Sequence, residues 1–209
     1  KELGLKGLYV LPDPPLPGVP LNHSYYDPLW AAIAELQVPL GIHEATGHHL
    51  DPVGVGHLTG SGISYANKAL SFGLGAMVAA LVFTGGGICE RHPGLKVVFT
   101  ESTAGWVATW LWYLDELWER EIEGHAVPNP PSYYFQRQCY ISAEPEEQAI
   151  KYVIDAQGDD NIIYNTDFPH PQEAKVTNPA DEFLALEGIS DLSKSKILWD
   201  NAAKLYKIE

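Results

Sequence analysis

The chain has 209 residues, of which 45% are hydrophobic and only 19% are charged, a composition that predicts one sizeable core rather than disorder. Lysine and arginine number 13 against 27 aspartates and glutamates, which gives a net charge of −14. So acidic a surface repels phosphate backbones and anionic lipid headgroups. We therefore expect no nucleic-acid partner and no electrostatic attachment to membranes.

Two cysteines, Cys89 and Cys139, lie far apart in the sequence and match neither a disulfide framework nor a CxxC metal motif. We predict two buried thiols in a reducing compartment and, because residues 1–10 lack the pattern of a signal peptide, a cytoplasmic location. The uncharged stretch at 69–88 is interrupted by glycines and a serine, which favours a buried helix over a membrane span.

Short aliphatic runs that end at proline, glycine or acidic residues predict five strands. They cover residues 5–12, 38–45, 96–102, 137–143 and 161–167. Helical spacing of apolar residues predicts helices between and after these strands. They cover residues 27–37, 69–88, 104–121, 144–158, 179–188 and 193–207. In the first of them, Asp27 is the expected N-cap and Pro28 the first helical residue.

Alternation of strands and helices predicts an α/β fold in which helices cover a parallel sheet, within one domain at 1–209. Three strands end on polar side chains: His43 with Glu44, Glu101, and Asp167. A (β/α)₈ barrel and a doubly wound open sheet both place ligands at the carboxyl ends of their strands. The barrel is favoured, because no glycine-rich phosphate loop follows a strand and opens a helix.

Each of these residues has a chemical and a structural interpretation. His43, a neutral imidazole near carboxylates, suits zinc, iron or manganese, or is a core histidine. Asp167 is a buried carboxylate, costly unless it is paired or bound to metal. His170, between two prolines, either contacts substrate or supports the site, or belongs to the loop. Glu101 is a metal ligand, a general base or one half of a structural ion pair.

Two further residues are candidates for substrate binding. Trp106 follows the third predicted strand and either lines a pocket or packs in the core. His48 lies with other histidines in a glycine-rich loop, which indicates a metal tract, a substrate lid or a flexible surface loop.

Four segments together resemble the amidohydrolase superfamily, in the branch that includes aminocarboxymuconate-semialdehyde decarboxylase. They are VPLGIHEAT, HPGLKVVFTESTAGWV, NIIYNTDFPHP and KILWDNAAKLY. The resemblance implies a distorted (β/α)₈ barrel, of which this chain supplies roughly strands 4–8 and the C-terminal helices. It also implies one or two divalent metal ions at the carboxyl ends of the strands, with zinc the first choice and iron or manganese the alternatives.

Under this resemblance, His43 looks like the metal ligand that ends the fifth barrel strand. Asp167 looks like the aspartate that ends the eighth, a metal ligand and the acceptor of a proton from the attacking water. The chain departs from the family in two respects. It lacks the HxH pair of the first strand, and Glu101, a third candidate ligand, stands where the decarboxylases usually have histidine.

These residues lead us to predict a metal-dependent hydrolase that activates water to attack an ester, amide, lactone or thioester carbonyl. Asp167, Glu101 and His170 are its predicted catalytic residues. One alternative is a metal-dependent non-oxidative decarboxylase of a small carboxylic acid. The other is a non-catalytic half-barrel subunit. The expected partners are a small-molecule substrate and either further copies of the chain or a chain that supplies the first barrel strands.

Overall fold

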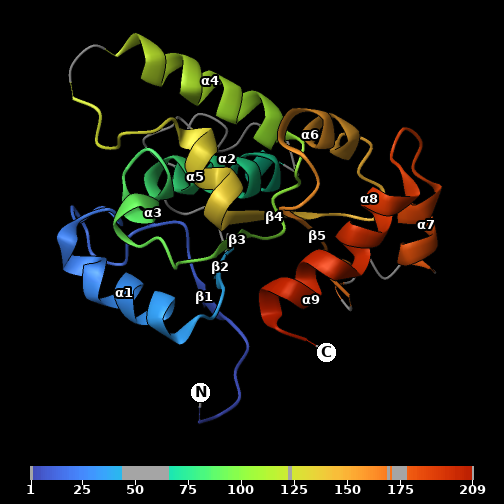
Figure 1. Cartoon of the computed structure of the whole chain (residues 1–209), viewed down its shortest axis with the longest axis horizontal. Helices are drawn as coiled ribbons and strands as arrows, with labels where there is room; N and C mark the ends of the chain where they lie inside the picture. Colours follow the sequence, from blue (N-terminus) through green and yellow to red (C-terminus); the bar gives the residue numbers. More distant parts are fainter. Residues whose placement is uncertain (1, 44–65, 122–123, 169, 171–177, 209) are drawn as a thin grey trace.

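The computed structural model describes residues 2–43, 66–121, 124–168, 170 and 178–208, with only the helical backbone for 66–71. Within them, five parallel strands form one sheet in chain order (Figure 1). These are β1 (Leu8–Val10), β2 (Leu40–Ile42), β3 (Val97–Phe99), β4 (Cys139–Ala143) and β5 (Ile162–Tyr164). The parallel sheet confirms the predicted α/β class, and all five strands begin inside the predicted ranges.

Helices connect the strands and follow the last one, as the helical spacing predicts. They are η1 (Ser24–Tyr26), α1 (Asp27–Leu36), α2 (Ala66–Phe83), α3 (Ile88–Arg91), α4 (Trp106–Arg120), α5 (Pro131–Gln138), α6 (Ile150–Gln157), α7 (Pro179–Ala185), α8 (Asp191–Ser195), the π-helical turn η5 (Lys196–Asp200) and α9 (Asn201–Tyr206). Pro28 lies in the first turn of α1, as predicted, but Asp27 is already helical and Tyr26 is the N-cap. The Asp27 carboxylate instead accepts hydrogen bonds from Arg91.

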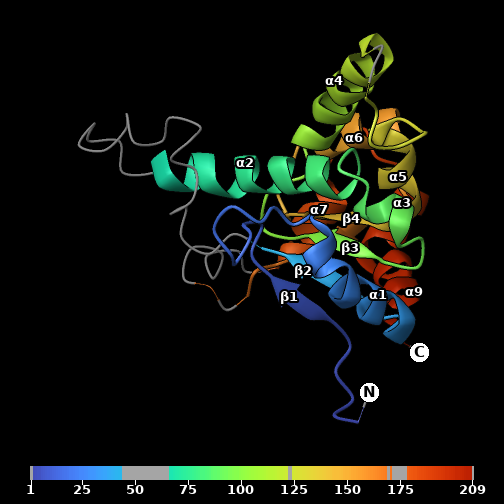
Figure 2. The ribbon, with the colours of Figure 1, turned by 90° about the vertical axis from the view of Figure 1, so that its left-hand side faces the viewer.

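One face of the sheet carries the main hydrophobic core. Alternate strand residues such as Leu40, Val97, Phe99 and Ile141 point to this face and are fully or almost fully buried. They pack against apolar side chains of the surrounding helices, among them Ala79, Ala80, Phe83, Val107, Leu111, Phe135 and Val153. Figure 2 shows α2 and α4 on this side of the sheet.

The opposite face of the sheet has a smaller core. Val98, Tyr140 and Ile163 project from it and pack with Leu205 of α9. In Figure 2, α9 lies across the sheet from α2. Side chains alternate along a strand, so every second residue lies on the same face. His43, two residues after Gly41, therefore lies on this face of the sheet.

Several predicted boundaries are wrong, and the helix predicted over 69–88 already ends at Phe83. Residues 137 and 138 end helix α5, which the strand prediction at 137–143 does not anticipate. The helix predicted over 144–158 begins only at Ile150, and the Glu147 side chain before it accepts hydrogen bonds from the backbone of Ala104 and Gly105. The short apolar runs that determine the strands are therefore easier to locate than the polar segments that join them.

The structure can also be compared with the predictions for the two cysteines and for membrane-spanning helices. Cys89 and Cys139 are free, buried thiols, as predicted. Among the helices that the structure describes, none combines the length and the hydropathy that crossing a membrane requires.

Candidate functional site

The register of the strands brings their carboxyl ends to one edge of the sheet. Leu40 of β2 is paired with Leu8 of β1 and with Val97 of β3, so neighbouring strands end at similar heights. The residues that follow β2, β3 and β5 are therefore neighbours, although they are separated by more than fifty residues in sequence. This is where His43, Glu101 and Asp167 meet.

His43 and Glu101 are in direct contact. The Nε2 atom of His43 approaches Oε2 of Glu101, and both side chains are partly buried. Two aromatic rings contact the imidazole edge-on: Tyr9, with ring centroids 5.7 Å apart, and Phe72, at 6.0 Å. The Tyr9 hydroxyl also donates a hydrogen bond of 3.2 Å to the carbonyl of His43. These contacts hold the imidazole at the strand end with its Nε2 atom directed at the carboxylate.

Asp167 extends this contact to a second histidine. Its carboxylate lies 3.6 Å from Nδ1 of His170, and its carbonyl accepts a 2.8 Å hydrogen bond from the His170 backbone. Burial raises the pKa of the Glu101 carboxyl, and the adjacent Asp167 raises it further against the opposing effect of His43. A second carboxylate beside Glu101 disfavours its ionised form unless a cation lies with them.

The backbone at both carboxylates is unusual. Glu101 and Asp167 have φ angles of 52° and 51°, and Thr103 has 54°. The left-handed conformation is uncommon outside glycine, so these positions are held by their surroundings. The Asp167 backbone N–H donates to Oδ1 of Asn165 over 3.0 Å, and the Glu101 N–H donates to the hydroxyl of Ser142 over 3.2 Å.

A further clamp holds the segment between Glu101 and helix α4. Oε1 of Glu147, in the loop after β4, accepts hydrogen bonds from the backbone N–H groups of Ala104 (2.6 Å) and Gly105 (2.8 Å). A side chain at Gly105 would bring its Cβ to 2.8 Å from Cβ of Ala149, so the segments also pack closely. Glu147 thereby ties the loop that carries Glu101 to β4 and α6.

Sequence reasoning missed both clamping residues. Ser142 is the polar residue of an otherwise apolar strand and is buried, which is a signal that the sequence does contain. Glu147 lies among acidic residues in EPEEQ, and nothing in that segment distinguishes it from its neighbours.

The remaining substrate-binding candidates lie apart from the cluster or outside the described residues. Trp106 begins α4 and packs its ring against Phe99 and Phe135, with centroids 6.0 and 6.5 Å away. Since Phe99 belongs to the main core, Trp106 lies on the helix-covered face of the sheet, across from His43. His48 lies outside the residues that the structure describes.

The donor types of the cluster suit a divalent cation, because one imidazole and two carboxylates are ligands for zinc, iron and manganese alike. The adjacent carboxylates of Glu101 and Asp167 are an environment that a cation would stabilise. In the described part of the chain, however, no three His, Cys, Asp or Glu side chains are grouped so that all could hold one ion. The chemistry fits a metal, and the donor set is partial.

A parallel sheet with helices around it and polar side chains gathered at its carboxyl edge defines a class of α/β enzyme-like folds, to which the (β/α)₈ barrels belong. Within that class, the chain can be assigned to one family. The model of the amidohydrolase family matches residues 1–208, and the chain belongs to this family.

Known proteins are similar to this chain in sequence and in fold. Gamma-resorcylate decarboxylase of Polaromonas sp. JS666 is 28% identical over 217 residues, which cover all of this chain and 64% of that protein. An amidohydrolase structure from Mycobacterium avium subsp. paratuberculosis covers 99% of the chain with a TM-score of 0.81 and 24% identity, over 52% of its own length. The Polaromonas dihydroxybenzoic acid decarboxylase structure, with bound manganese and 2-nitroresorcinol, covers 91% at a TM-score of 0.69 and 24% identity, over 57% of its own length.

These comparisons confirm the predicted part of a barrel fold and correct the predicted reaction. The chain spans about half to two thirds of the length of these relatives, and its five strands match part of their barrel fold. The prediction of a hydrolase is wrong, because the curated relatives that match, gamma-resorcylate decarboxylases and a 2-amino-3-carboxymuconate-6-semialdehyde decarboxylase, are decarboxylases. A metal site at strand ends is shared by both reaction classes and does not distinguish them.

Proposed function

We propose that this chain carries part of the active site of a metal-dependent, non-oxidative decarboxylase of small aromatic carboxylic acids. The observation that carries the proposal is the contact of His43 with Glu101, and of Glu101 with Asp167, at the carboxyl edge of a sheet whose curated relatives decarboxylate such acids. Aromatic rings line the approach to this cluster, because Tyr9 and Phe72 flank His43.

A divalent cation would take its donors from among His43, Glu101 and Asp167, although the described arrangement does not bring all three onto one ion. Manganese is the first choice, because a decarboxylase of the same fold is described with it. When bound, such a cation supplies positive charge that attracts the oxygen atoms of a carboxylate substrate. Its remaining ligands would come from outside the described cluster. We propose either barrel strands in addition to these five or an associated chain as their source.

The chain's own residues would perform the proton transfer. Decarboxylation breaks the bond between the ring carbon and the carboxylate carbon, leaves the electron pair on the ring carbon and releases carbon dioxide. A proton must then reach that ring carbon. Asp167, whose carboxylate contacts His170, would deliver this proton, and His170 would return a proton to Asp167 from solvent. Tyr9 and Phe72 would exclude water from one side of the cluster.

The proposal is tested by carbon dioxide release from gamma-resorcylate in the presence of Mn²⁺, comparing the chain with its Asp167→Asn variant. We expect release by the parent chain and a loss of about 100-fold or more in the variant, the scale of general acid catalysis. Asp155→Asn, an exposed change of the same type on α6, is the matched control. Absence of release by the parent chain, when it is assembled with the source of the remaining ligands, would contradict the proposal.

A second measurement tests the source of the missing donors. β1 is an edge strand of the described sheet, and Leu8, Tyr9 and Leu11 beside its free edge are 40%, 55% and 38% exposed. Exposed apolar edges favour pairing with another strand. Light scattering coupled to gel filtration should therefore show association of the chain, whereas a stable monomer would contradict this part of the proposal.

A further inference from the structure

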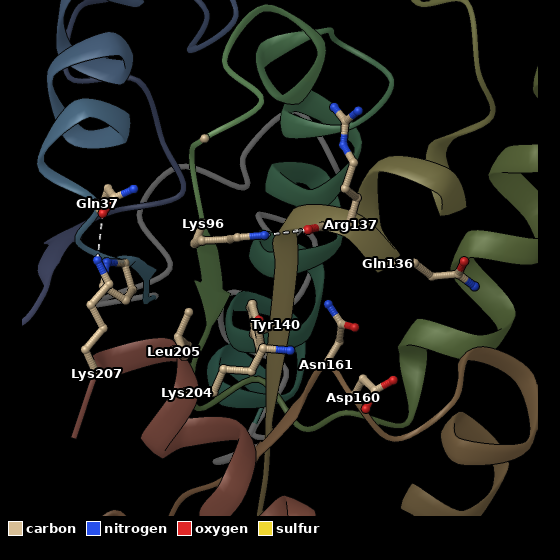
Figure 3. Close-up of a pocket in the computed structure, with 12 residues that line it drawn as sticks. Gln37, Lys96, Gln136, Arg137, Tyr140, Asp160, Asn161, Lys204, Leu205 and Lys207 are labelled. Carbon is tan, nitrogen blue, oxygen red and sulfur yellow. Dashed lines mark hydrogen bonds between the residues drawn. The ribbon is translucent and has the colours of Figure 1, made fainter. Parts of the chain in front are cut away.

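A pocket of about 500 Å³ lies at the opposite end of the sheet from the acidic cluster (Figure 3). Its walls include Pro39, Lys96 and Asn161, which directly precede β2, β3 and β5. Helix α9 closes another side with Lys204 and Leu205. A pocket formed at the amino-terminal ends of parallel strands does not share residues with a site at their carboxyl ends.

Positive charge is concentrated in this pocket. Lys96, Lys204 and Lys207 all line it, in a chain whose net charge is −14 and which has only 13 lysines and arginines. Figure 3 shows the three lysine side chains on the walls of the pocket, while the Arg137 side chain points away from them. Three amino groups around one pocket form a local positive field within an acidic protein.

These lysines have no acidic partner in the described part of the chain. The Nζ atom of Lys96 donates to the carbonyl of Arg137 over 2.6 Å, and that of Lys207 donates to Oε1 of Gln37 over 2.9 Å. The carboxylate that lines the pocket, Asp160, has its Oδ1 atom 2.5 Å from Nζ of Lys196 instead. The positive charge at the pocket is therefore not neutralised by ion pairs.

Lys96 has the most constrained position of the three. It is half-buried, and burial lowers the pKa of its amino group, with the positive charges of Arg137 and Lys204 acting in the same direction. Like charges held together in a partly desolvated pocket raise the free energy of the folded state, and a bound anion would remove that cost. The pocket therefore has the electrostatic character of a site that binds anions.

We propose that this pocket binds a small molecule with two or more negative charges, of the phosphate-ester or polycarboxylate class. Three separate ammonium groups favour a multiply charged ligand over a single carboxylate, because each can approach a different anionic oxygen. Amide side chains of Gln37 and Asn161 and the ring of Tyr140 provide polar and flat surfaces beside them. The volume is within the range of about 300–1,000 Å³ that small-molecule sites occupy.

The first experiment is a calorimetric titration of the whole chain with pyrophosphate, with citrate and with acetate, in low salt and in about 0.5 M NaCl. We expect saturable binding of one equivalent of pyrophosphate or citrate, no binding of acetate, and weaker binding at high salt. The stronger of the two polyanions identifies whether phosphate or carboxylate chemistry is recognised. No saturation by either up to about 10 mM would overturn the proposal.

Variants then locate the site. Lys204→Gln combined with Lys207→Gln should weaken the preferred polyanion by about tenfold or more, the effect of losing two charge-assisted contacts. The control is Lys151→Gln on α6, which removes a positive charge that does not line the pocket, since the Lys151 amino group lies over the Tyr152 ring. Equal weakening by the control, or unchanged binding in the double variant, would contradict the assignment.

The folding of each variant is verified separately, so that weak binding can be attributed to the lost lysines rather than to unfolding. Circular dichroism should show the same spectrum for parent and variants, because Lys204 and Lys207 are exposed. If the double variant does not fold, Lys207→Gln alone still tests the site, with an expected loss of about threefold. The assay contains no divalent metal and no aromatic acid, so its outcome is independent of the proposed decarboxylation.

Discussion

The two ends of the parallel sheet have opposite charge, and the sequence pattern reveals only one of them. At the carboxyl end, His43, Glu101 and Asp167 each follow shortly after a strand, so the strand pattern alone places them together. At the amino end, Lys96 precedes β3 whereas Lys204 and Lys207 lie in and after the last helix. Side chains at strand ends can thus be grouped from sequence, while a site that a helix completes depends on how that helix packs.

The two ends also differ in how firmly their side chains are held. Ser142 and Glu147 fix the backbone around Glu101 from neighbouring segments. At the other end, Lys96 and Lys207 each donate one hydrogen bond to a neutral group, and Lys204 and Lys207 are exposed. We therefore expect substitutions near the carboxyl end to change both stability and function, and those at the amino end to change ligand binding with little effect on stability.

The largest expected effect is on metal binding. Glu101→Gln removes one anionic donor of the cluster and should weaken Mn²⁺ binding by more than the factor of about 10–100 that the loss of an outer-sphere partner causes. Titration followed by calorimetry measures this, with the exposed Glu119→Gln as the matched control. Polyanion binding at the lysines should not change, and coupled loss at both ends would show that the two sites are not independent.

The next largest effect is expected on the free energy of unfolding, at Glu147. Glu147→Ala leaves the N–H groups of Ala104 and Gly105 without their acceptor, so the free energy of unfolding should fall by about 2–3 kcal/mol. Urea denaturation followed by tryptophan fluorescence provides the measurement. A change below about 0.5 kcal/mol, the scale of ordinary surface substitutions, would show that the loop is held by packing alone.

A smaller effect depends on pH. Burial raises the pKa of the Glu147 carboxyl above its ordinary value of 4.5, against the opposing effect of its backbone hydrogen bonds. The folded state therefore favours the protonated carboxyl, and this contribution to stability is complete below the unfolded pKa and is lost as pH rises through the folded pKa.

Glu147→Gln keeps the acceptor oxygen but not the titration. Its unfolding free energy should match that of the parent near pH 4 and equal or exceed it at neutral pH, which denaturation at a series of pH values tests. A parent that becomes steadily more stable than the variant above pH 4.5 would show that the ionised carboxylate is the favoured form.

The smallest effect is expected at the lysines. Without a bound anion, Lys204→Gln relieves repulsion of Lys96, so the unfolding free energy should rise by about 0.3 kcal/mol at low ionic strength. The gain should disappear in high salt, because screening removes the repulsion. Thermal denaturation at two salt concentrations measures it, and a fall in stability at low salt would show that Lys204 makes a stabilising contact instead.

The strand pattern predicted the sheet and the acidic cluster for a physical reason. Strands buried on both faces need nearly continuous apolar runs, and a polar residue at their end is therefore visible against them. His43, Glu101 and Asp167 fall at such ends. His170 was predicted because it follows Asp167 closely and lies between two prolines in the sequence.

The clamps and the lysine pocket could not be predicted in the same way. Glu147 binds backbone atoms 42 and 43 residues away, and neither its identity nor its spacing distinguishes it from Glu146. Helix α5 was missed because PSYYFQRQ has few aliphatic residues, although Pro131 begins it. The proposed reaction class also rests on the relatives, because the same candidate ligands suit hydrolysis and decarboxylation.

The left-handed backbone at Asp167 has an evolutionary consequence. Asparagine and aspartate tolerate this conformation better than other residues with a side chain, so most replacements at this position would disturb the fold as well as the chemistry. Asparagine has the shape and the backbone preference of aspartate but neither its charge nor its acidity, and one nucleotide change converts the codon of one into that of the other. Among descendants of this chain, a well-folded form that lacks the carboxylate at position 167 is therefore a single mutation away.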